Sequence, residues 1–547
     1  MFSGDNANIL QQKLDKVPFA IQHILIAVLS LFFFIPFLGS VHLFDWDEIN
    51  FAESAREMLI TGNYFRVQIN FQPFWEKPPF FFWLQAVSMK MFGINEFAAR
   101  FPNAICGVLT LNFIFYIGRK RFTSLFGWLW VAAYVGSLLP HFYFKSGIID
   151  PWFNLFIFSS VFFLFQAEIN RQTKFFAFAG ITTGMAILTK GPVGLLLVLL
   201  TATIFVLIKR NIQWINLKGL LLFLGLAFSV SFFWYGFELI QNGTWFINEF
   251  IEYHIRLFST RDAGHGGPFF YHPIVIFFGC FPASIIALQL FFNNKKIFDN
   301  NSLKLWMTVL FFVVLTLFSI VKTKIVHYSS MCYLPLTFLA AYTLYNNIYQ
   351  RFLSRMILFI GALIALVFTL LPIVGNNINL LKPFLKKDPF ALAAISVEVN
   401  WQYWLVIFGM SYFVLVLISY FLISKQNFKG YLLLFCATAF LIFFSLPFFV
   451  PKIERYSQGS IIDFYKTLKG KEAYVEVTGF KSYAQYFYTQ KPLTENNITD
   501  KYTLLNQPLN KPIYIITKIH KAKKFQEQYP DFVKHYENAG FVVFVKK

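Results

Sequence analysis

Long apolar segments dominate this chain and limit what it can fold into. A membrane-spanning helix needs about 20 largely apolar residues. Thirteen stretches meet this condition, near residues 20–41, 100–118, 124–141, 152–169, 175–191, 192–208, 217–239, 270–292, 304–321, 328–347, 354–375, 403–424 and 430–450. At 547 residues, 57% hydrophobic and 14% charged, the chain is too apolar for a soluble protein of its length. We therefore predict a polytopic α-helical membrane protein with about 13 transmembrane helices.

Basic residues occupy every second connection between these segments. They occur at Arg119–Arg121, at Arg171 and Lys174, at Lys209 and Arg210, at Lys295 and Lys296, at Arg351 and Arg355, and at Lys425 and Lys429. Because cytoplasmic loops are enriched in Lys and Arg, this alternation predicts that these connections and the N-terminus are cytoplasmic. The same loop clusters account for much of the net charge of +20, so we expect no nucleic-acid partner.

The opposite face collects the long connections, near residues 42–99, 142–151, 240–269, 322–328, 376–402 and 451–547. The last of these alternates strand-like stretches such as "KPIYIITKI" with amphipathic helical stretches such as "HKAKKFQEQY". We predict a transmembrane domain over residues 1–450, with amphipathic helices in loop 42–99, and a small soluble α/β domain over 451–547.

The stretch "DWDEINFAESAREML", residues 45–59, follows the first apolar segment. Its apolar residues recur at helical spacing, and Glu53 can pair with Arg56, which predicts a helix lying on the membrane surface. Two interpretations of its acidic residues remain. They can cap the helix, with Asp45 as the cap and Glu48 reaching back, or they can be the reactive groups of a membrane enzyme.

Five further stretches place polar groups on the same face. "FWEKPPFFFW" holds Lys77 at the membrane surface, where a lysine can extend toward water or bind a lipid phosphate. Asp150 in "GIIDPWF" can cap a helix, and Lys190 in "AILTKGPVG" can extend toward water. The segment 252–273 carries three histidines, for which a solvated loop and a metal site are both open. Lysines in "KTKIVHY" oppose the positive-inside pattern and suggest an anionic partner such as a lipid headgroup.

Motifs in this order resemble a known family. "DEINFAESAREM", "EKPP", "EFAARFPN", "IIDPWF", "TKG", "HI…GHGGPF" and K-x-x-x-Y are similar to those of the superfamily that contains the aminoarabinose transferases and the protein O-mannosyltransferases, with the lipid A aminoarabinose transferases nearest. The resemblance implies a GT-C glycosyltransferase fold in the bacterial inner membrane, with the C-terminal domain in the periplasm. It also implies transfer of a sugar from a polyprenyl (undecaprenyl) phosphate to lipid A or another glycolipid on the periplasmic face.

The resemblance also assigns roles to individual residues. It implies that Asp47 and Asp150 are catalytic. It implies that the substrate is bound by Arg56, Lys77, Lys190, Arg256, Lys324 and Tyr328. A divalent metal, Zn or Mg, would be associated with Glu76, His254 and His265.

Two departures from the family pattern leave the acceptor open. Arg256 stands one place early, with Leu257 in the family's arginine position, and Gly266 replaces a basic residue. A protein acceptor, as in the O-mannosyltransferases, is therefore an alternative to a glycolipid. A lipid-linked sugar flippase is the alternative from another class, although the predicted spans carry few charges in their middles, which favours an enzyme. For a hydroxyl acceptor, we expect an inverting displacement with Asp47 as the base.

Overall fold

The computed structural model describes residues 4–261, 266–293, 301–493 and 500–546. Each of the thirteen predicted segments coincides with a helix or with a broken pair of helices. These are α2 (Phe19–Phe34), α5 (Glu96–Arg121), α6 (Ser124–Val135), α8 (Asp150–Asn170), α9 (Lys174–Lys190), α10 (Val193–Lys209), α11 (Leu217–Asn242), α13 (Tyr271–Gly279) with α14 (Ala283–Leu288), α16 (Ser302–Ile320), α17 (Tyr333–Tyr345), α18 (Arg351–Asn376), α20 (Val406–Ser424) and α21 (Lys429–Phe448).

Within the described ranges, seven of these helices are individually long and apolar enough to cross a membrane, namely α5, α8, α11, α16, α18, α20 and α21. Helices α13 and α14 meet at an angle of 109° and would form an eighth, broken span. Helices α2, α6 and α10 are apolar but shorter. The predicted class, a polytopic helical membrane protein, is confirmed.

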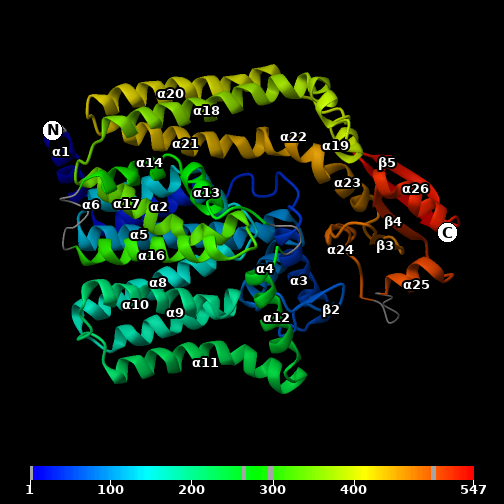
Figure 1. Ribbon diagram of the computed structural model, residues 1–547, viewed down its shortest axis with the longest axis horizontal. Helices are drawn as coiled ribbons and strands as arrows, with labels where there is room; N and C mark the ends of the chain where they lie inside the picture. The colour runs from blue at the N-terminus through cyan, green and yellow to red at the C-terminus, as the bar shows by residue number, and fades with distance from the viewer. Residues whose placement is uncertain (1–3, 262–265, 294–300, 494–499, 547) are drawn as a thin grey trace.

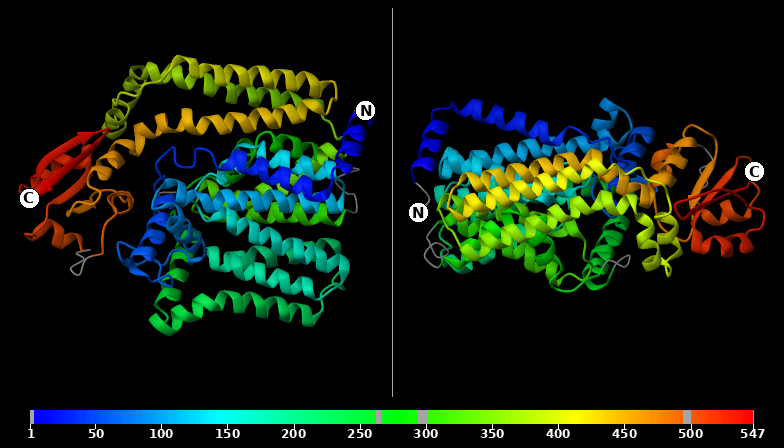
Figure 2. Two further views of the ribbon diagram at one scale, coloured as in Figure 1. Left: turned by 180° about the vertical axis from the view of Figure 1, so that it is seen from behind. Right: turned by 90° about the horizontal axis from the view of Figure 1, so that it is seen from above.

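The long helices run side by side in one direction (Figure 1). Helices α18, α20 and α21 form one edge of the bundle and α9, α10 and α11 the other, with α5, α8, α16 and α17 between them. The N-terminus lies at one end of the bundle and the C-terminal sheet at the other, which the views from behind and from above also show (Figure 2). The short elements 47–92 and α12 (Trp245–Ser259) lie at the end nearer the sheet, where the sequence places the long connections.

The C-terminal part has the predicted α/β composition. Its elements are α22 (Val450–Glu454), α23 (Ser460–Thr467), β3 (Tyr474–Val477), α24 (Ala484–Thr489), α25 (Lys501–Asn506), β4 (Ile513–Lys518), α26 (Ile519–Gln528), β5 (Val533–Asn538) and β6 (Phe541–Lys546). The four strands are ordered β3-β4-β6-β5, with β3 and β4 parallel and the other pairs antiparallel. Strand β5 was not predicted, because this edge strand is polar and largely exposed and lacks an apolar face.

Loop 42–99 folds into a compact unit. It contains α3 (Asp47–Thr61), the hairpin strands β1 (Gln68–Ile69) and β2 (Gln72–Pro73), and α4 (Phe80–Phe92). The prediction that α3 lies on the membrane surface is wrong, because every residue from Glu48 to Met58 is buried. Helix α4 covers one side and α24 of the C-terminal part packs against α3 as well. The polar side of α3 can be buried because Glu53 pairs with Arg56 within the helix and Glu48 pairs with Arg100 of α5.

Asp45 is not the cap that the sequence suggested. The cap position of α3 is Trp46, and no side chain caps the helix. Glu48 does reach back, because its Oε2 accepts a hydrogen bond from the amide of Phe44 at 2.9 Å. The carboxyl of Asp45 turns away and bonds to Ser482 and to the backbone of Tyr483 in the C-terminal part.

A buried ion pair holds this unit on the bundle. Arg100 of α5 binds both carboxylate oxygens of Glu48, at 2.9 Å through Nε and 2.7 Å through Nη2. The same guanidinium donates to the carbonyls of Leu38, Val41 and His42. Burial alone would raise the pKa of Glu48, but Arg100 and two backbone amides lower it below its usual range. Glu48 is therefore a charged, fully bonded anchor for the start of α3.

We predict that Arg100→Met destabilises the protein by about 3–5 kcal/mol, because it leaves the buried charge of Glu48 unpaired. The double variant Arg100→Met with Glu48→Gln should recover part of this loss. Thermal unfolding of the full chain in detergent measures both effects. A single variant with an unchanged unfolding temperature would contradict the anchoring role.

Candidate active site

Two polar residues meet where α8 begins and α9 ends. Because the two helices are antiparallel neighbours, Asp150 at the start of α8 comes close to Lys190 at the end of α9. The Lys190 Nζ lies 2.6 Å from Asp150 Oδ1, and both side chains are buried. The simpler interpretations of the sequence, a helix cap for Asp150 and an extension toward water for Lys190, are both wrong. Asp150 makes no cap hydrogen bond, and Lys190 does not extend into water.

His327 joins this pair to Asp47. It belongs to the short helix η3 (Val326–Cys332), which follows α16. Its Nε2 lies 3.2 Å from Asp47 Oδ2 and 4.0 Å from Asp150 Oδ2. Burial lowers the pKa of His327 even though the two carboxylates act to raise it, so the imidazole is neutral at neutral pH. The two predicted catalytic carboxylates therefore lie near the same ring nitrogen of one imidazole.

The sequence analysis missed His327. The residue lies between Lys324 and Tyr328 in the stretch "KTKIVHY", which was singled out for its lysines. A lone histidine next to an aromatic residue has no spacing that distinguishes it from a buried core residue. Only the fold brings it to the two carboxylates, which come from distant parts of the chain.

Lys77 contributes a further positive charge near these residues and contacts helix α12. Its Nζ is 3.3 Å from the hydroxyl of Tyr253 in α12 and 4.8 Å from the centre of that ring. A cation over an aromatic face is stabilised while its charge stays available to a further anion. In the described part of the chain, Lys77 forms no ion pair with a carboxylate.

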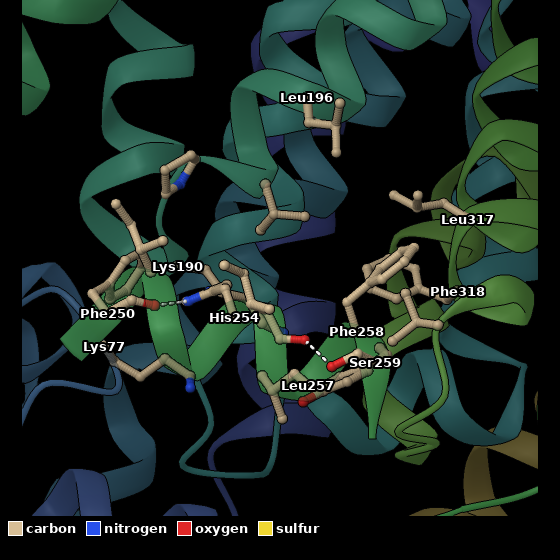
Figure 3. A pocket seen from close by; sticks show the side chains of 16 residues that line it. Lys77, Lys190, Leu196, Phe250, His254, Leu257, Phe258, Ser259, Leu317 and Phe318 are labelled. Atoms are coloured by element: carbon tan, nitrogen blue, oxygen red, sulfur yellow. Dashed lines mark hydrogen bonds between the residues drawn. The ribbon is translucent and has the colours of Figure 1, made fainter. Parts of the chain in front are cut away.

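A cavity of about 490 Å³ opens between α10, α12 and α16. It is lined by Lys77, Lys190, Pro192, Val193, Leu196, Phe250, Ile251, His254, Ile255, Leu257, Phe258, Ser259, Leu317, Phe318, Val321 and Tyr328. Figure 3 shows Lys77 and His254 near one end, with Leu196 and Leu317 away from them. The cavity thus joins a cationic end to a long apolar wall.

An apolar groove continues this wall along the membrane helices. It has a volume of about 370 Å³ and lies between α10 and α16. Leu317 lines both the cavity and the groove, and Ile204, Ile208 and Phe312 lie farther along it. Ile204, Ile208 and Phe312 are exposed, as expected for a surface that faces lipid, whereas Val309 and Val313 in the same lining are buried.

The expected metal site is not supported by the described residues. They contain no group of three His, Cys, Asp or Glu side chains that could hold a metal ion. The Nδ1 of His254 is 2.8 Å from the carbonyl of Phe250, and burial together with Lys77 and Lys190 lowers the pKa of His254 to about 4. Glu76 is half-buried, and His265 lies outside the described residues.

Arg56 is not at the site, which corrects the prediction that it lies near the donor phosphate. Both oxygens of Glu53 bind its guanidinium at 2.7 Å, as the sequence predicted for this pair, and its Nη1 donates to the carbonyl of Lys491. The reason is helical geometry. Arg56 follows Asp47 by nine residues, about 2.5 turns of helix, so it points to the opposite face of α3.

Two further predicted substrate contacts also lie outside the cavity. Arg256 stands 5.4 Å from the centre of the Tyr253 ring and is absent from the described lining residues. Lys324 donates to the carbonyls of Phe318 and Ser319 at the end of α16 and lines a neighbouring pocket. Of the predicted substrate-binding residues, the structure brings Lys77, Lys190 and Tyr328 to the cavity.

Known proteins resemble this chain in sequence and in fold. Residues 76–235 match the family described as dolichyl-phosphate-mannose-protein mannosyltransferase. An uncharacterized protein of Aquifex aeolicus is 31% identical over 58% of this chain and 72% of its own length. The undecaprenyl phosphate-alpha-4-amino-4-deoxy-L-arabinose arabinosyl transferase of Wigglesworthia glossinidia brevipalpis is 25% identical over 60% of this chain. The matched region spans 59% of the length of that relative.

The crystal structure of ArnT from Cupriavidus metallidurans bound to undecaprenyl phosphate has the same fold. It matches with a TM-score of 0.76 at 17% identity, over 96% of this chain and 98% of that one. The apo state of the same protein matches equally well. The chain therefore has the GT-C fold of the membrane glycosyltransferases, and its sequence is similar to the aminoarabinose transferases and to the protein mannosyltransferase family.

Proposed function

We propose that this glycosyltransferase moves a sugar from undecaprenyl phosphate to a lipid A or other glycolipid acceptor on the periplasmic face of the inner membrane. The observation that carries the proposal is the cavity with a cationic end, an apolar wall and a carboxylate–imidazole–carboxylate cluster beside it. A polyprenyl-phosphate sugar has the matching parts, namely an anionic phosphate, a long apolar chain and a reactive anomeric carbon between acceptor and phosphate.

The donor phosphate binds at Lys77. Lys190 is already neutralised by Asp150 at 2.6 Å, whereas among the described residues Lys77 is held by the ring and hydroxyl of Tyr253 and by no carboxylate. Negative charge develops on the phosphate as the bond to the sugar breaks, and a preorganised cation stabilises that transition state. The apolar wall and the groove between α10 and α16 then receive the polyprenyl chain.

Asp47 is the base that receives the acceptor proton. Its side chain is 29% exposed, whereas that of Asp150 is 3% exposed and bound to Lys190, so Asp47 is the carboxylate that an acceptor can reach. His327 holds Asp47 in place from the side of Asp150. The acceptor oxygen attacks the anomeric carbon opposite the phosphate, which inverts that centre and releases undecaprenyl phosphate.

The mannosyltransferase family match over residues 76–235 supports a protein hydroxyl acceptor as the second candidate. One experiment separates the two. The full chain in nanodiscs is given labelled undecaprenyl-phosphate aminoarabinose with lipid A, and in parallel labelled polyprenyl-phosphate mannose with periplasmic protein. We expect label on lipid A and stoichiometric release of undecaprenyl phosphate. Label on protein alone would establish the second candidate, and no transfer from either donor would contradict both.

We predict that Asp47→Asn lowers kcat for a hydroxyl acceptor by about 10²–10⁴-fold, because the variant cannot take the proton. The affinity for undecaprenyl phosphate should stay within about twofold, since Lys77 is unchanged. Steady-state kinetics and lipid binding measure the two quantities. The matched control is Asp45→Asn, two positions earlier and turned toward the C-terminal part, which should keep most of the activity. Near-normal turnover in Asp47→Asn would exclude the base role.

We predict that Lys77→Gln lowers kcat/KM for the donor by about 10²-fold or more, because the cation that meets the departing phosphate is lost. Lys77→Arg should retain part of the activity, since the charge is preserved. Lys90→Gln on the exposed end of α4 removes the same charge away from the cavity and serves as the control. If Lys77→Gln and Lys90→Gln behaved alike, the phosphate would have to bind elsewhere.

A further inference from the structure

A second pocket lies beside the donor cavity. It has a volume of about 610 Å³ and is lined by Ser259, Thr260, Arg261, Gly267, Phe269, Ser319, Ile320, Val321, Lys322 and Lys324. Ser259 and Val321 line both spaces, so the end of α12 and the end of α16 separate the two. None of the residues that we assign to the reaction lines this pocket, so it is distinct from the reacting centre.

Positive charge dominates the pocket. Arg261, Lys322 and Lys324 line it, and its described lining residues include no carboxylate. The Nζ of Lys324 donates to the carbonyls of Phe318 and Ser319 at 2.9 and 2.6 Å, which fixes this ammonium at the end of α16. Because an ammonium has three donors, Lys324 keeps one beyond these two bonds. Arg261 and Lys322 are exposed and Lys324 is buried, and together the three positive charges make the pocket attractive to an anion.

A buried hydroxyl in the same lining is also unsatisfied. The side chain of Ser319 is 4% exposed, and its Oγ has no hydrogen-bond partner among the described residues. A buried polar atom without a partner costs free energy, so this hydroxyl gains from any ligand or water that bonds to it. This hydroxyl and the three cations together form a set of hydrogen-bond donors suited to phosphate oxygens.

The position of the pocket fits a membrane lipid. Helix α16 is long and apolar enough to span the bilayer and ends at Ile320, so the pocket lies where the hydrocarbon region gives way to headgroups. Ile320 and Phe269, both in the lining, are 55% and 53% exposed. Exposed apolar side chains next to cations match a lipid, which brings acyl chains and a phosphate together.

We propose that this pocket binds the phosphate headgroup of an anionic phospholipid from the surrounding leaflet. The lipid would bridge the end of α12 and the end of α16, which form one wall of the donor cavity. Its phosphate chemistry is shared with undecaprenyl phosphate, so the test must separate these two sources. The inference does not rest on the proposed sugar transfer, because lipid binding is measured without it.

The test is native mass spectrometry of the full chain in detergent, titrated with phosphatidylglycerol or with phosphatidylcholine. We expect selective retention of phosphatidylglycerol by the wild type. The double variant Arg261→Gln/Lys322→Gln should weaken this binding by roughly fivefold for each cation removed. The control Lys386→Gln/Lys387→Gln, which removes two exposed cations after η4 (Ile378–Leu385), should bind like the wild type.

Ser319→Ala provides a second, independent variant. Because the hydroxyl has no protein partner, this change should weaken phosphatidylglycerol binding severalfold without lowering the unfolding temperature. Equal phosphatidylglycerol binding by the wild type and the double variant would overturn the proposal. It would also be overturned if the double variant lost undecaprenyl phosphate while keeping phosphatidylglycerol, because the pocket would then belong to the donor.

Discussion

The buried pair of Glu48 and Arg100 is the interaction on which the rest of the site depends. Arg100 binds both oxygens of Glu48 and three carbonyls that follow α2, while Glu48 also accepts the amides of Phe44 and Gly147. One charge pair therefore joins α5, the start of α3 and the segment before α8. Removing two ions from water is costly, and this pair offsets the cost only because nearly every donor and acceptor is satisfied. The consequence is a fixed orientation for α3, whose first residue is Asp47.

That orientation gives α3 two different faces. Asp47 points to His327, and Arg56, about 2.5 turns later, points to the C-terminal part and bonds to Lys491. On the second face Glu53 and Glu57 are buried close together, and burial with the charge of Glu53 raises the pKa of Glu57 well above its usual range. The helix that carries the proposed base is thus held by the membrane bundle on one side and by the α/β part on the other.

The fold class could be predicted from the sequence, together with the grouping of the long connections at one end of the bundle, because apolar length and basic loops are local signals. It also singled out Lys77 and Lys190, which the fold brings to one cavity. It did not find His327, and it misplaced Arg56 and the cap of α3, because these depend on which face of a helix meets which neighbour. The two residues of the K-x-x-x-Y element likewise could not be placed from the sequence, because their side chains point to different spaces. Tyr328 lines the donor cavity, whereas Lys324 turns back to the end of α16 and lines a second pocket.

We propose that one cavity holds the donor phosphate at Lys77 and leads its polyprenyl chain into the groove between α10 and α16. The most direct test is a cryo-electron microscopy structure of the full chain in nanodiscs with undecaprenyl phosphate. We predict density for the phosphate within hydrogen-bonding distance of the Lys77 ammonium and for the isoprenoid chain passing Leu317 toward Ile204. Phosphate density away from Lys77, or a chain that leaves the cavity by another path, would contradict the account.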